Sequence, residues 1–580
     1  MSKTALIALS IAAVVAIASW VLFLPGFFYV HDFLHAARIA EMARGLTDFH
    51  LPVRWSEAFG YGYGMPLFLF YAPLPFFVGA LSWLSGVSII TSVKMIFLLS
   101  TIMAALGSYQ VARKITGVMP ALVAMAAFTL APYRGVNLVV RGAVSESWAI
   151  ATYPWILLGI LLIMRRERWG VAILVSALTT LLLSHNISTL LFIPLTILII
   201  ALWMIWKKYK GEVKELISTG TQFLLSYTLS IGLAAFYIFP AFLEKHFTVV
   251  EQTILDGYFE YSLHFVSLRQ FVTENWGYGG STFGPADDMS FFLGYGQIFG
   301  LIVLCISAGV YFWKQGLRAV FGSIFEWLSK EKHFFVSIFL CLTLVTLFMA
   351  QYKSAFLWNV LPLLEYIQFP WRWLGATSIF LALSLAVGLE LLQERKKRFF
   401  SLVILLIIAV TSWRYFVPDQ QLSATDEFYF TDQVRISEEL SPVLPDYIST
   451  AFSQPDKDIS QYQSLAFDDD QLTPVGSLVH SSVDLKTYQL ELATAAMVVA
   501  PIAYFPGWSA TIDAGEQVEL VVDDNGLIGA YLPAGSHTLT FAFNHTPIRQ
   551  ISDIITLISV ILSIWLLVKA SRRRGNWVSR

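Results

Sequence analysis

The chain has 580 residues, of which 56% are hydrophobic and 15% aromatic, whereas only 13% are charged. A soluble globular domain carries roughly 25% charged residues, about twice this share. Because so little charge cannot solvate a water-soluble body of this size, the composition excludes a large soluble protein and indicates a polytopic membrane protein. The formal net charge of −2 argues against nucleic acid as the main partner. Both cysteines, Cys305 and Cys341, lie in apolar runs, which excludes a disulfide framework or a cysteine-based zinc site.

Apolar runs of spanning or near-spanning length recur along the chain. The first, residues 4–28, is too long for the hydrophobic part of a signal peptide, so we interpret it as a retained span whose amino terminus faces the cytoplasm. Further runs lie near residues 66–86, 88–108, 118–133, 147–164, 170–184, 187–206, 221–241, 290–313, 333–351, 373–392, 399–416 and 550–569. Such lengths match the hydrocarbon core of a bilayer, or nearly so.

Basic clusters set the predicted orientation, because positively charged loops stay in the cytoplasm. They are Arg113-Lys114, Arg165 to Arg168, Lys207 to Lys210, Lys314 to Lys332, Arg395 to Arg398 and Arg572 to Arg574. All of them face inward only if residues 66–108 cross the membrane once. Pro66, Pro73 and Pro75 favour this, since they would hold segment 66–86 as an interfacial or half-embedded piece. We expect about twelve crossings of the cell (plasma) membrane, with both termini cytoplasmic.

This topology places five segments on the outer face of the membrane. They are residues 29–65, 134–146, 242–289, 352–372 and 417–549. The inner loops are short and basic, whereas the outer segments hold most of the acids, aromatic residues and glycines. Long ordered loops more often carry function, so we expect any site to face outward.

The tail segment, residues 417–549, differs in pattern from the rest of the chain. Its apolar runs shorten and alternate, as in Val518 to Val522, and turn signals such as Asp523 to Gly526 separate them. We expect a small extracytoplasmic β-rich domain there, after a helical transmembrane domain over residues 1–416. A final transmembrane helix and a basic cytoplasmic tail would follow over residues 550–580. The predicted fold class is therefore mostly α, with a small β-rich domain.

The first outer segment holds the strongest candidate acid. Asp32, in His31-Asp32, directly follows the first span, so its carboxylate would lie at the mouth of a cavity and not in lipid. At helical spacing Asp32 shares a face with His35. Two interpretations stay open for Asp32: a catalytic carboxylate, or an aspartate that caps a short interfacial helix.

Charged residues next to spans mark two more outer segments. Arg141 and Glu146 each need a partner or a wet cavity. For Glu146, an Arg–Glu pair that joins two helix ends is an alternative at least as strong as ligand binding. Trp371-Arg372-Trp373 place a guanidinium between two indoles at a predicted helix start, which suits a phosphate. The alternative is an ordinary interfacial belt of Trp and Arg.

Other polar groups are weaker candidates. His185-Asn186 lies at the outer end of a short span, where a helix-end hydrogen-bonding pair is favoured over a ligand role. Asp287-Asp288 and Asp468-Asp469-Asp470 offer oxygen ligands for a divalent cation. Solvated acidic turns explain both equally simply, so no cofactor is assigned and a divalent cation is left open.

Short motifs in a fixed order carry a family resemblance. They are His31-Asp32 with Arg38, Pro52 to Trp55, Gly62 to Pro66, Tyr71 to Pro75, Arg141-Gly142 with Glu146, Ser184 to Asn186, Gln368 to Arg372, Tyr504 to Trp508 and Leu532 to His537. Together they resemble the bacterial and archaeal membrane proteins labelled "6-pyruvoyl-tetrahydropterin synthase-related", and the YfhO-like membrane proteins. The zinc-binding histidines of the soluble pterin enzyme have no counterpart, so we do not expect pterin synthesis. The resemblance implies the GT-C superfamily of integral-membrane glycosyltransferases and its helical bundle.

Such an enzyme would pass a sugar from a polyprenyl-phosphate carrier to a glycan or lipid acceptor on the outer face. The family's acid, often one of a pair in the first outer loop, corresponds to Asp32, which the resemblance makes the catalytic base. Because His31 replaces the second acid, metal use is left open. The expected substrate-binding residues are Arg372 and Arg141 for the carrier phosphate, with Arg54, His31, Glu146, Trp371, Tyr63 and His185.

Two other classes of function remain as alternatives. A lipid or polysaccharide transporter, or flippase, predicts broken helices near the bilayer midplane and an inverted repeat. A non-catalytic envelope-assembly protein would use the tail domain for binding and would need no acid at position 32. Sugar transfer by the wild type that is lost in Asp32→Asn would distinguish the glycosyltransferase from the transporter and from the assembly protein.

Overall fold

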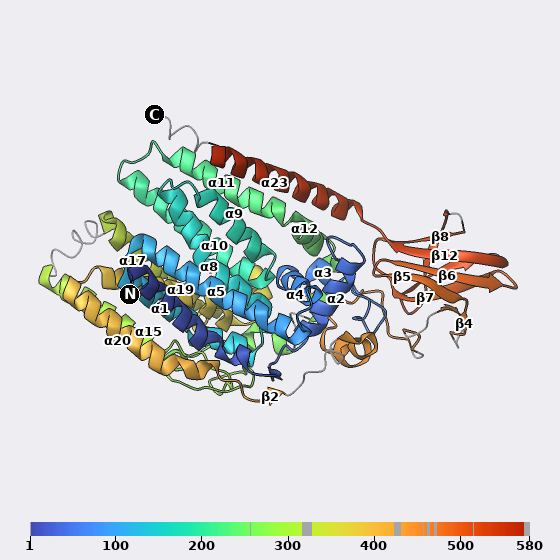
Figure 1. Ribbon diagram of the computed structural model, residues 1–580, viewed down its shortest axis with the longest axis horizontal. Coiled ribbons are helices and arrows are strands. Elements are labelled where there is room, and N and C mark those ends of the chain that lie inside the picture. The colour runs from blue at the N-terminus through green and yellow to red at the C-terminus, as the bar shows by residue number, and fades with distance from the viewer. Residues whose placement is uncertain are drawn as a thin grey trace.

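A helical bundle forms most of the molecule, and a sandwich of two β-sheets projects from one end of it (Figure 1). The computed structural model describes residues 2–572, apart from 254, 256, 316–327, 423–430, 456–457, 461–463, 469–471 and 514. The start of α1 and the end of α23 lie at the end of the bundle away from the sandwich (Figure 1). Parts of two basic clusters, residues 316–327 and 573–574, lie outside the described residues.

The helices, in chain order, divide the apolar sequence at its proline, glycine and charged positions. They are α1 (Lys3–Ser19), α2 (His35–Thr47), α3 (Leu67–Phe70), α4 (Leu74–Leu84), α5 (Ile89–Ile115), α6 (Val118–Thr129), α7 (Pro132–Gly135), the π-helix η2 (Val136–Val140), α8 (Val144–Met164), α9 (Gly170–Leu182), α10 (Asn186–Tyr209), α11 (Leu216–Leu233), α12 (Ala235–Leu243), α13 (Val250–Thr253), α14 (Leu268–Val272), α15 (Tyr295–Gln315), α17 (Glu331–Met349), α18 (Ala355–Val360), α19 (Trp373–Glu390), α20 (Glu394–Ser412), α22 (Gln433–Arg435) and α23 (Pro547–Arg572).

Within the described residues, eight helices are long and apolar enough to cross a membrane, or up to ten if each of two bent helix pairs is one span. About twelve crossings were expected. The difference arises partly because the runs near 170–184 and 290–313 contribute only shorter apolar helices, Gly170–Leu182 and Tyr295–Tyr311. The run 66–86 forms α3 and the 11-residue α4. At 1.5 Å per residue α4 reaches about half of a ~30 Å hydrocarbon core, so it does not span.

The sandwich consists of two five-stranded sheets in which every pairing is antiparallel, with strand orders β10-β11-β7-β3-β4 and β5-β6-β12-β8-β9. The strands are β3 (Leu465–Phe467), β4 (Pro474–Val475), β5 (Ser477–Ser482), β6 (Leu485–Leu492), β7 (Ala496–Ala503), β8 (Trp508–Ile512), β9 (Glu516–Val518), β10 (Leu520–Val522), β11 (Leu527–Leu532) and β12 (Gly535–Phe543). In β12, Leu539, Phe541 and Phe543 alternate into the core, as the period of two predicts. The expected mostly α membrane protein with a β-rich tail is confirmed.

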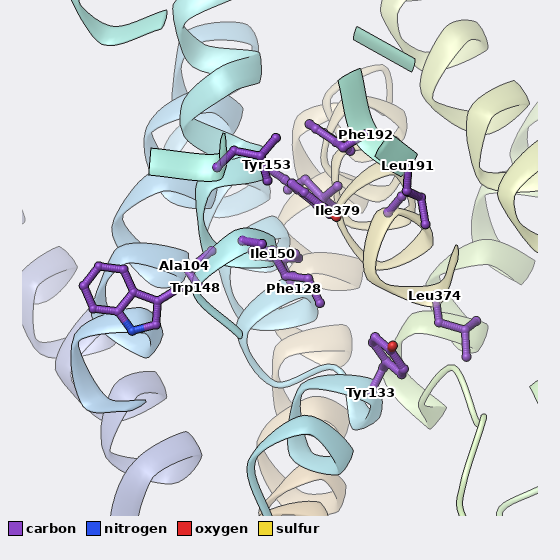
Figure 2. Close-up of a cluster of buried hydrophobic side chains, with 14 of the residues drawn as sticks. Ala104, Phe128, Tyr133, Trp148, Ile150, Tyr153, Leu191, Phe192, Leu374 and Ile379 are labelled. Atoms are coloured by element: carbon purple, nitrogen blue, oxygen red, sulfur yellow. The ribbon is translucent and has the colours of Figure 1, made fainter. Parts of the chain in front are cut away.

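The core of the bundle surrounds α8, nearly all of whose side chains are buried. Figure 2 shows side chains of α8 (Trp148, Ile150, Tyr153) among those of neighbouring helices (Phe128, Leu191, Phe192, Leu374, Ile379). The rings of Tyr153 and Phe192 stack with centroids 3.7 Å apart. A Cβ on Gly159 would lie 2.7 Å from Leu174 Cα, so only glycine permits this approach of α8 to α9. Packing of this density fixes α8, and with it Glu146 in its first turn.

The two ends of the bundle collect different parts of the chain. Predicted inner loops meet at one end, where Arg165 pairs with Glu331 at 2.8 Å and Lys332 with Glu390 at 3.1 Å. Predicted outer segments meet at the other end, beside the sandwich, where α2, α3 and α4 lie (Figure 1). The short strands β1 (Phe27–Phe28) and β2 (Gln421–Leu422) also pair there, joining the end of the first span to the start of the tail segment.

Candidate active site

The first and second outer segments are joined through their backbones. The N–H of His31 donates to the carbonyl of Val140 at 3.0 Å, and that of Asp32 donates to the carbonyl of Arg141 at 3.0 Å. These carbonyls follow the π-helical turn η2, a feature often found at functional sites. Gly142 has a φ of +64°, and a Cβ there would lie 2.9 Å from the Asp32 carbonyl oxygen. Glycine therefore lets the two segments approach.

Asp32 is held by Arg38 from the first turn of α2. Arg38 Nη1 lies 2.9 Å from both carboxylate oxygens, and the N–H of Leu34 donates to Oδ1 at 3.3 Å. The N-cap position of α2 is Leu34, which makes no side-chain cap, so Asp32 does not cap this helix. The Asp32 side chain is 32% exposed, whereas that of Arg38 is 3% exposed. The carboxylate is thus fixed in place and still accessible.

The contacts among Asp32, His35 and Arg38 determine their protonation states. Burial alone would raise the pKa of Asp32, but Arg38 and His35 hold it below its usual value. Burial lowers the pKa of His35, which is therefore neutral near pH 7. The His35 Nε2–H donates to the Gly142 carbonyl, and Nδ1 accepts from Arg38 Nη1 at 3.3 Å. Asp32 and Arg38 face the site as an ion pair beside a neutral imidazole.

A second charged centre surrounds Glu146 at the start of α8. Its carboxylate accepts from Arg141 Nη1 at 2.7 Å and from the Tyr133 hydroxyl at 2.5 Å, and Asn137 Nδ2 lies 3.4 Å away. Arg372 Nε lies 3.5 Å from the same carboxylate. The Arg–Glu pair considered as the alternative for Glu146 is therefore formed, and Glu146 holds two guanidinium groups.

Arg372 and Trp371 approach this centre from the fourth outer segment, in the 3-10 turn η8 (Pro370–Arg372). Arg372 Nη1 donates to Ile367 O at 2.8 Å and to Gln368 Oε1 at 2.7 Å. Its Nε forms no hydrogen bond within the described residues. Trp371 is buried, and the Arg141 guanidinium lies 4.6 Å from its ring centroid. Arg372 thus keeps a donor unused although only 10% of its side chain is exposed.

The two centres adjoin each other because the backbone of Asp32 is bonded to that of Arg141. Together they contain three guanidinium groups and two carboxylates, which leaves one net positive charge. A buried excess of positive charge is unfavourable without an anion. The arrangement suits a phosphate that enters next to an accessible carboxylate.

Two predicted site residues lie elsewhere, at the junction with the sandwich. Arg54 Nη2 donates to Asp553 Oδ1 at 2.6 Å, in α23. The Tyr63 hydroxyl donates to Asp458 Oδ1 at 3.0 Å, and the ring is buried against the outer face of one sheet. Phe70, an aromatic residue of α3, packs into the sandwich core. Arg54, Tyr63 and Phe70 therefore connect the sandwich to the bundle.

The two predicted histidines lie at the margins of the site. The exposed His31 ring is bonded through Nε2 to the carbonyl of Tyr278 at 2.8 Å, in the third outer segment. His185 caps α10, with Nδ1 accepting from the N–H of Ser188 at 3.3 Å. Burial lowers the pKa of His185 to about 3, although the nearby Glu146 carboxylate acts in the opposite direction. His185 therefore adds no charge to the site near pH 7.

Arg38 and Tyr71 are the site residues that the sequence did not assign. The Arg38 guanidinium lies 4.4 Å from the centroid of Tyr71. His35 and Arg38 are three residues apart on α2, a spacing that places both on one helical face. That spacing was the available signal for Arg38, whereas Tyr71 arrives from a separate segment between α3 and α4.

An apolar cavity of about 320 Å³ adjoins Asp32. It is lined by Phe27, Phe28, Tyr29, Val30, Phe33, His35, Ala36, Ile90, Val93 and Leu422. His35 contacts both this cavity and the Asp32–Arg38 pair, so a hydrocarbon chain in the cavity would place its polar end beside the charged groups.

Metal ligation has little support within the described residues. They contain no group of three or more His, Cys, Asp or Glu side chains that could hold a metal ion. Asp287 Oδ1 accepts from the N–H of Thr282 at 2.7 Å, and Oδ2 accepts from Gln270. Asp469 and Asp470 lie outside the described residues.

Comparisons with known proteins agree with a membrane protein of this architecture. Residues 68–418, more than half of the chain, match a family described as "6-pyruvoyl-tetrahydropterin synthase related domain; membrane protein". No curated protein matches. Among solved structures, the chain is similar to the arabinofuranosyltransferase AftD from Mycobacteria, at 13% identity and a TM-score of 0.44, covering 94% of this chain and 40% of that chain. A mutant of AftD gives 13% identity and a TM-score of 0.41, covering 74% and 29%.

A further solved structure is ArnT from Cupriavidus metallidurans bound to undecaprenyl phosphate, at 11% identity and a TM-score of 0.37, covering 75% of this chain and 78% of that chain. The chain spans less than half the length of AftD. TM-scores this low establish no activity, so function has to be inferred from the residues of the site.

Proposed function

The chain belongs to the 6-pyruvoyl-tetrahydropterin synthase-related family of membrane proteins, and we propose that it is an integral-membrane glycosyltransferase. It would move a sugar from a polyprenyl-phosphate carrier to a glycan or lipid acceptor on the outer face of the cell membrane. One observation carries the proposal: an accessible carboxylate, Asp32, adjoins a buried cluster with an excess of guanidinium groups.

The positive-inside rule supports the orientation that this activity needs. The end of the bundle that gathers the described basic residues, the start of α1 and the end of α23 would face the cytoplasm. Asp32, the Glu146 centre and the sandwich would then face outward, where lipid-linked sugars and envelope acceptors meet. The proposal thus keeps the expected topology.

Asp32 would act as the general base. The acceptor oxygen attacks the anomeric carbon, its proton passes to the Asp32 carboxylate, and the bond from that carbon to the phosphate oxygen breaks with its electron pair leaving on the phosphate. A carboxylate of low pKa is a weak base. It suffices here because the attacking hydroxyl becomes strongly acidic as its oxygen bonds to an oxocarbenium-like carbon.

Arg372 and Arg141 would stabilise the departing phosphate. Its charge grows as the sugar leaves, and fixed donors in a water-poor site stabilise such charge strongly. Arg372 Nε, which makes no hydrogen bond in the described residues, lies 3.5 Å from the Glu146 carboxylate and would instead donate to the phosphate. Glu146 keeps both guanidinium groups oriented when no phosphate is bound.

The apolar cavity beside His35 supports a carrier with a long hydrocarbon chain. Its wall is apolar apart from His35, so it would accept isoprene units and guide the phosphate toward Asp32. Burial of the chain would contribute about 0.8 kcal/mol per methylene group. An acceptor without such a chain would not need this cavity.

The test uses purified protein with a panel of polyprenyl-phosphate sugars. We expect wild-type transfer from one of them and a fall of about 10²–10⁴ in kcat for Asp32→Asn, the usual contribution of a general base. Asp524→Asn, at an exposed turn of the sandwich, is the matched control and should behave as wild type. Undiminished transfer by Asp32→Asn would remove this residue from the mechanism, and the absence of wild-type transfer from every donor would reject the enzyme.

One observation favours a transporter as the second candidate. Leu216–Leu233 and Ala235–Leu243 are bent by 73° at a short break, and Val118–Thr129 and Pro132–Val140 are bent by 43°. Broken helices are common in transporters. In proteoliposomes, a transporter would move a fluorescent polyprenyl phosphate between leaflets without changing it chemically, and Asp32→Asn would not abolish sugar transfer because none would occur.

A further inference from the structure

A short loop of the tail segment, residues 445–450, precedes the first strand of the sandwich and packs against the third outer segment. The N–H of Val249 donates to the Ile448 carbonyl at 3.0 Å, and the N–H of Thr450 donates to the Phe247 carbonyl at 2.9 Å. These bonds pair the loop with the third outer segment in a ladder-like manner. The side chains at 446 and 447 are thereby held at a fixed place.

Tyr447 extends from this loop to the residues around Asp32. Its ring stacks on Phe70 with centroids 5.8 Å apart and meets the edge of Tyr71 at 6.2 Å. Tyr71 in turn lies under the Arg38 guanidinium at 4.4 Å. Tyr447 thus contacts the core of the bundle and the core of the sandwich at once. The tail segment therefore contributes directly to the surroundings of the Asp32–Arg38 pair.

One buried polar group here has no protein partner. Arg38 Nε forms no hydrogen bond within the part of the chain that the structure describes. The Arg38 side chain is 97% buried, since only 3% is exposed. A buried guanidinium N–H without an acceptor costs free energy. A ligand oxygen at this place would remove that cost.

Asp446, the neighbour of Tyr447, brings a further carboxyl to the same place. It is half-buried, and its charge acts on Arg38 and Tyr71. Burial raises the pKa of this carboxyl. A carboxyl group accepts hydrogen bonds from hydroxyl groups.

We propose that Asp446 and Tyr447, with Arg38, form the acceptor subsite, and that this subsite binds the hydroxyl groups of a carbohydrate. A sugar carries several neighbouring hydroxyls, each able to donate and accept, which matches a carboxyl, a phenol and a guanidinium N–H placed together. Because Arg38 also holds Asp32, an acceptor bound there would present one hydroxyl to the base. This inference rests on the proposed function and names its acceptor class.

The experiment measures the KM for acceptor and for donor separately. Octyl β-glucoside, octyl α-mannoside and octyl β-galactoside serve as acceptors, and 1-octanol is the acceptor with a chain but no sugar. Methyl glycosides of the same sugars test whether a lipid chain is needed. Release of sugar to water, measured without acceptor, reports donor use alone.

The variants are Asp446→Asn and Tyr447→Phe, which preserve shape and the ring contacts. We expect each to raise the KM for the octyl glycoside about tenfold, the effect of losing one hydrogen bond to a charged or buried group, and to change the donor KM by less than twofold. Asp524→Asn and Tyr531→Phe, both exposed on the sandwich, are matched controls and should leave both constants unchanged.

Three results would overturn the inference and leave the proposed function intact: an unchanged acceptor KM in both variants, 1-octanol used as well as the glycosides, or sugar release to water by a wild type that accepts no glycoside. No sugar release from any donor would overturn both. If Asp446→Asn does not accumulate, Tyr447→Phe alone decides. Added octyl glycoside should also slow hydrogen exchange of residues 445–450 in the wild type and not in Tyr447→Phe.

Discussion

The two ends of the helical bundle use charged residues in different ways. At the basic end, Lys114 and Glu167 form an ion pair while 38% and 39% of their side chains remain exposed. At the sandwich end, Arg549 and Glu244 form a pair that is 0% and 2% exposed. Exposed pairs contribute roughly 0–1 kcal/mol, whereas burying an ion costs several kcal/mol. The exposed charges at the basic end need no role beyond orienting the chain in the membrane. Because burial of charge is costly, the buried charges at the sandwich end indicate a structural or chemical role.

Within the sandwich end, the two buried centres also differ. Each guanidinium nitrogen of Arg549 has an acceptor: Glu244 at 2.9 Å, Pro506 O at 2.8 Å and Asn544 O at 3.3 Å. Arg372 keeps its Nε without a hydrogen bond in the described residues. A fully satisfied network fixes structure, while an unsatisfied one is prepared for a ligand. This contrast distinguishes the Arg549–Glu244 pair from Arg372, although Arg54 at the junction also has an Nε without a hydrogen bond in the described residues.

The largest effect is expected at the junction. Glu244→Ala leaves Arg549 buried and without its carboxylate, which costs about 3–5 kcal/mol. Thermal unfolding of the purified protein should occur at a clearly lower temperature, and protease should release the sandwich more readily. An unchanged unfolding temperature would contradict the structural role of this pair.

Loss of the Arg372 guanidinium should affect activity more than folding. Arg372→Gln removes a donor that we propose for the departing phosphate and should lower kcat by about 10²–10³. Glu146 still has Arg141, so the protein should fold. Arg269→Gln, at an exposed arginine of the third outer segment, is the control. Equal kcat values for the two variants would place the phosphate elsewhere.

Acid should destabilise the protein through His185. Its pKa is about 3 in the folded protein, below the ordinary value of 6.5, chiefly because of burial. As the pH falls from 6.5 toward 3, the unfolded chain takes up a proton that the native state does not, so stability is lost over this range. His185→Asn retains a cap for α10 and removes the titration. Its unfolding temperature should fall less between pH 6.5 and 5 than that of the wild type; parallel curves would contradict this.

The smallest effect is expected at the basic end. Arg165 pairs with Glu331 at 2.8 Å while 31% and 50% of the two side chains are exposed. Arg165→Gln should therefore change the free energy of unfolding by less than about 1 kcal/mol and leave transfer unchanged. A loss comparable to that of Glu244→Ala would remove the distinction between the two ends.

Local patterns predicted much of this architecture. The apolar runs correspond to helices, and the basic clusters between them meet, as in the pair of Arg165 with Glu331, because length and charge are local properties of the sequence. The count of long apolar helices in the described residues, eight to ten, falls below the expected crossings partly where an apolar run forms a helix of only 13 residues, as α9 does. Hydropathy records that a run is apolar, not that its helix is long enough to cross.

The partners inside the site were beyond such patterns. Asp32 precedes α2, so helical spacing did not connect it to Arg38 six residues later, although the two are bonded at 2.9 Å. Arg54 was expected near the phosphate but pairs with Asp553, 499 residues away in sequence. Contacts over such separations depend on how the sandwich docks on the bundle, which a single sequence does not encode locally.

The most direct test is an electron-microscopy structure of the protein in lipid nanodiscs with a polyprenyl phosphate. We predict the phosphate within hydrogen-bonding distance of Arg372 and Arg141, with Asp32 open to solvent beside it and the chain entering the cavity next to His35. A phosphate bound at the basic end, or anywhere apart from these two guanidinium groups, would contradict the account.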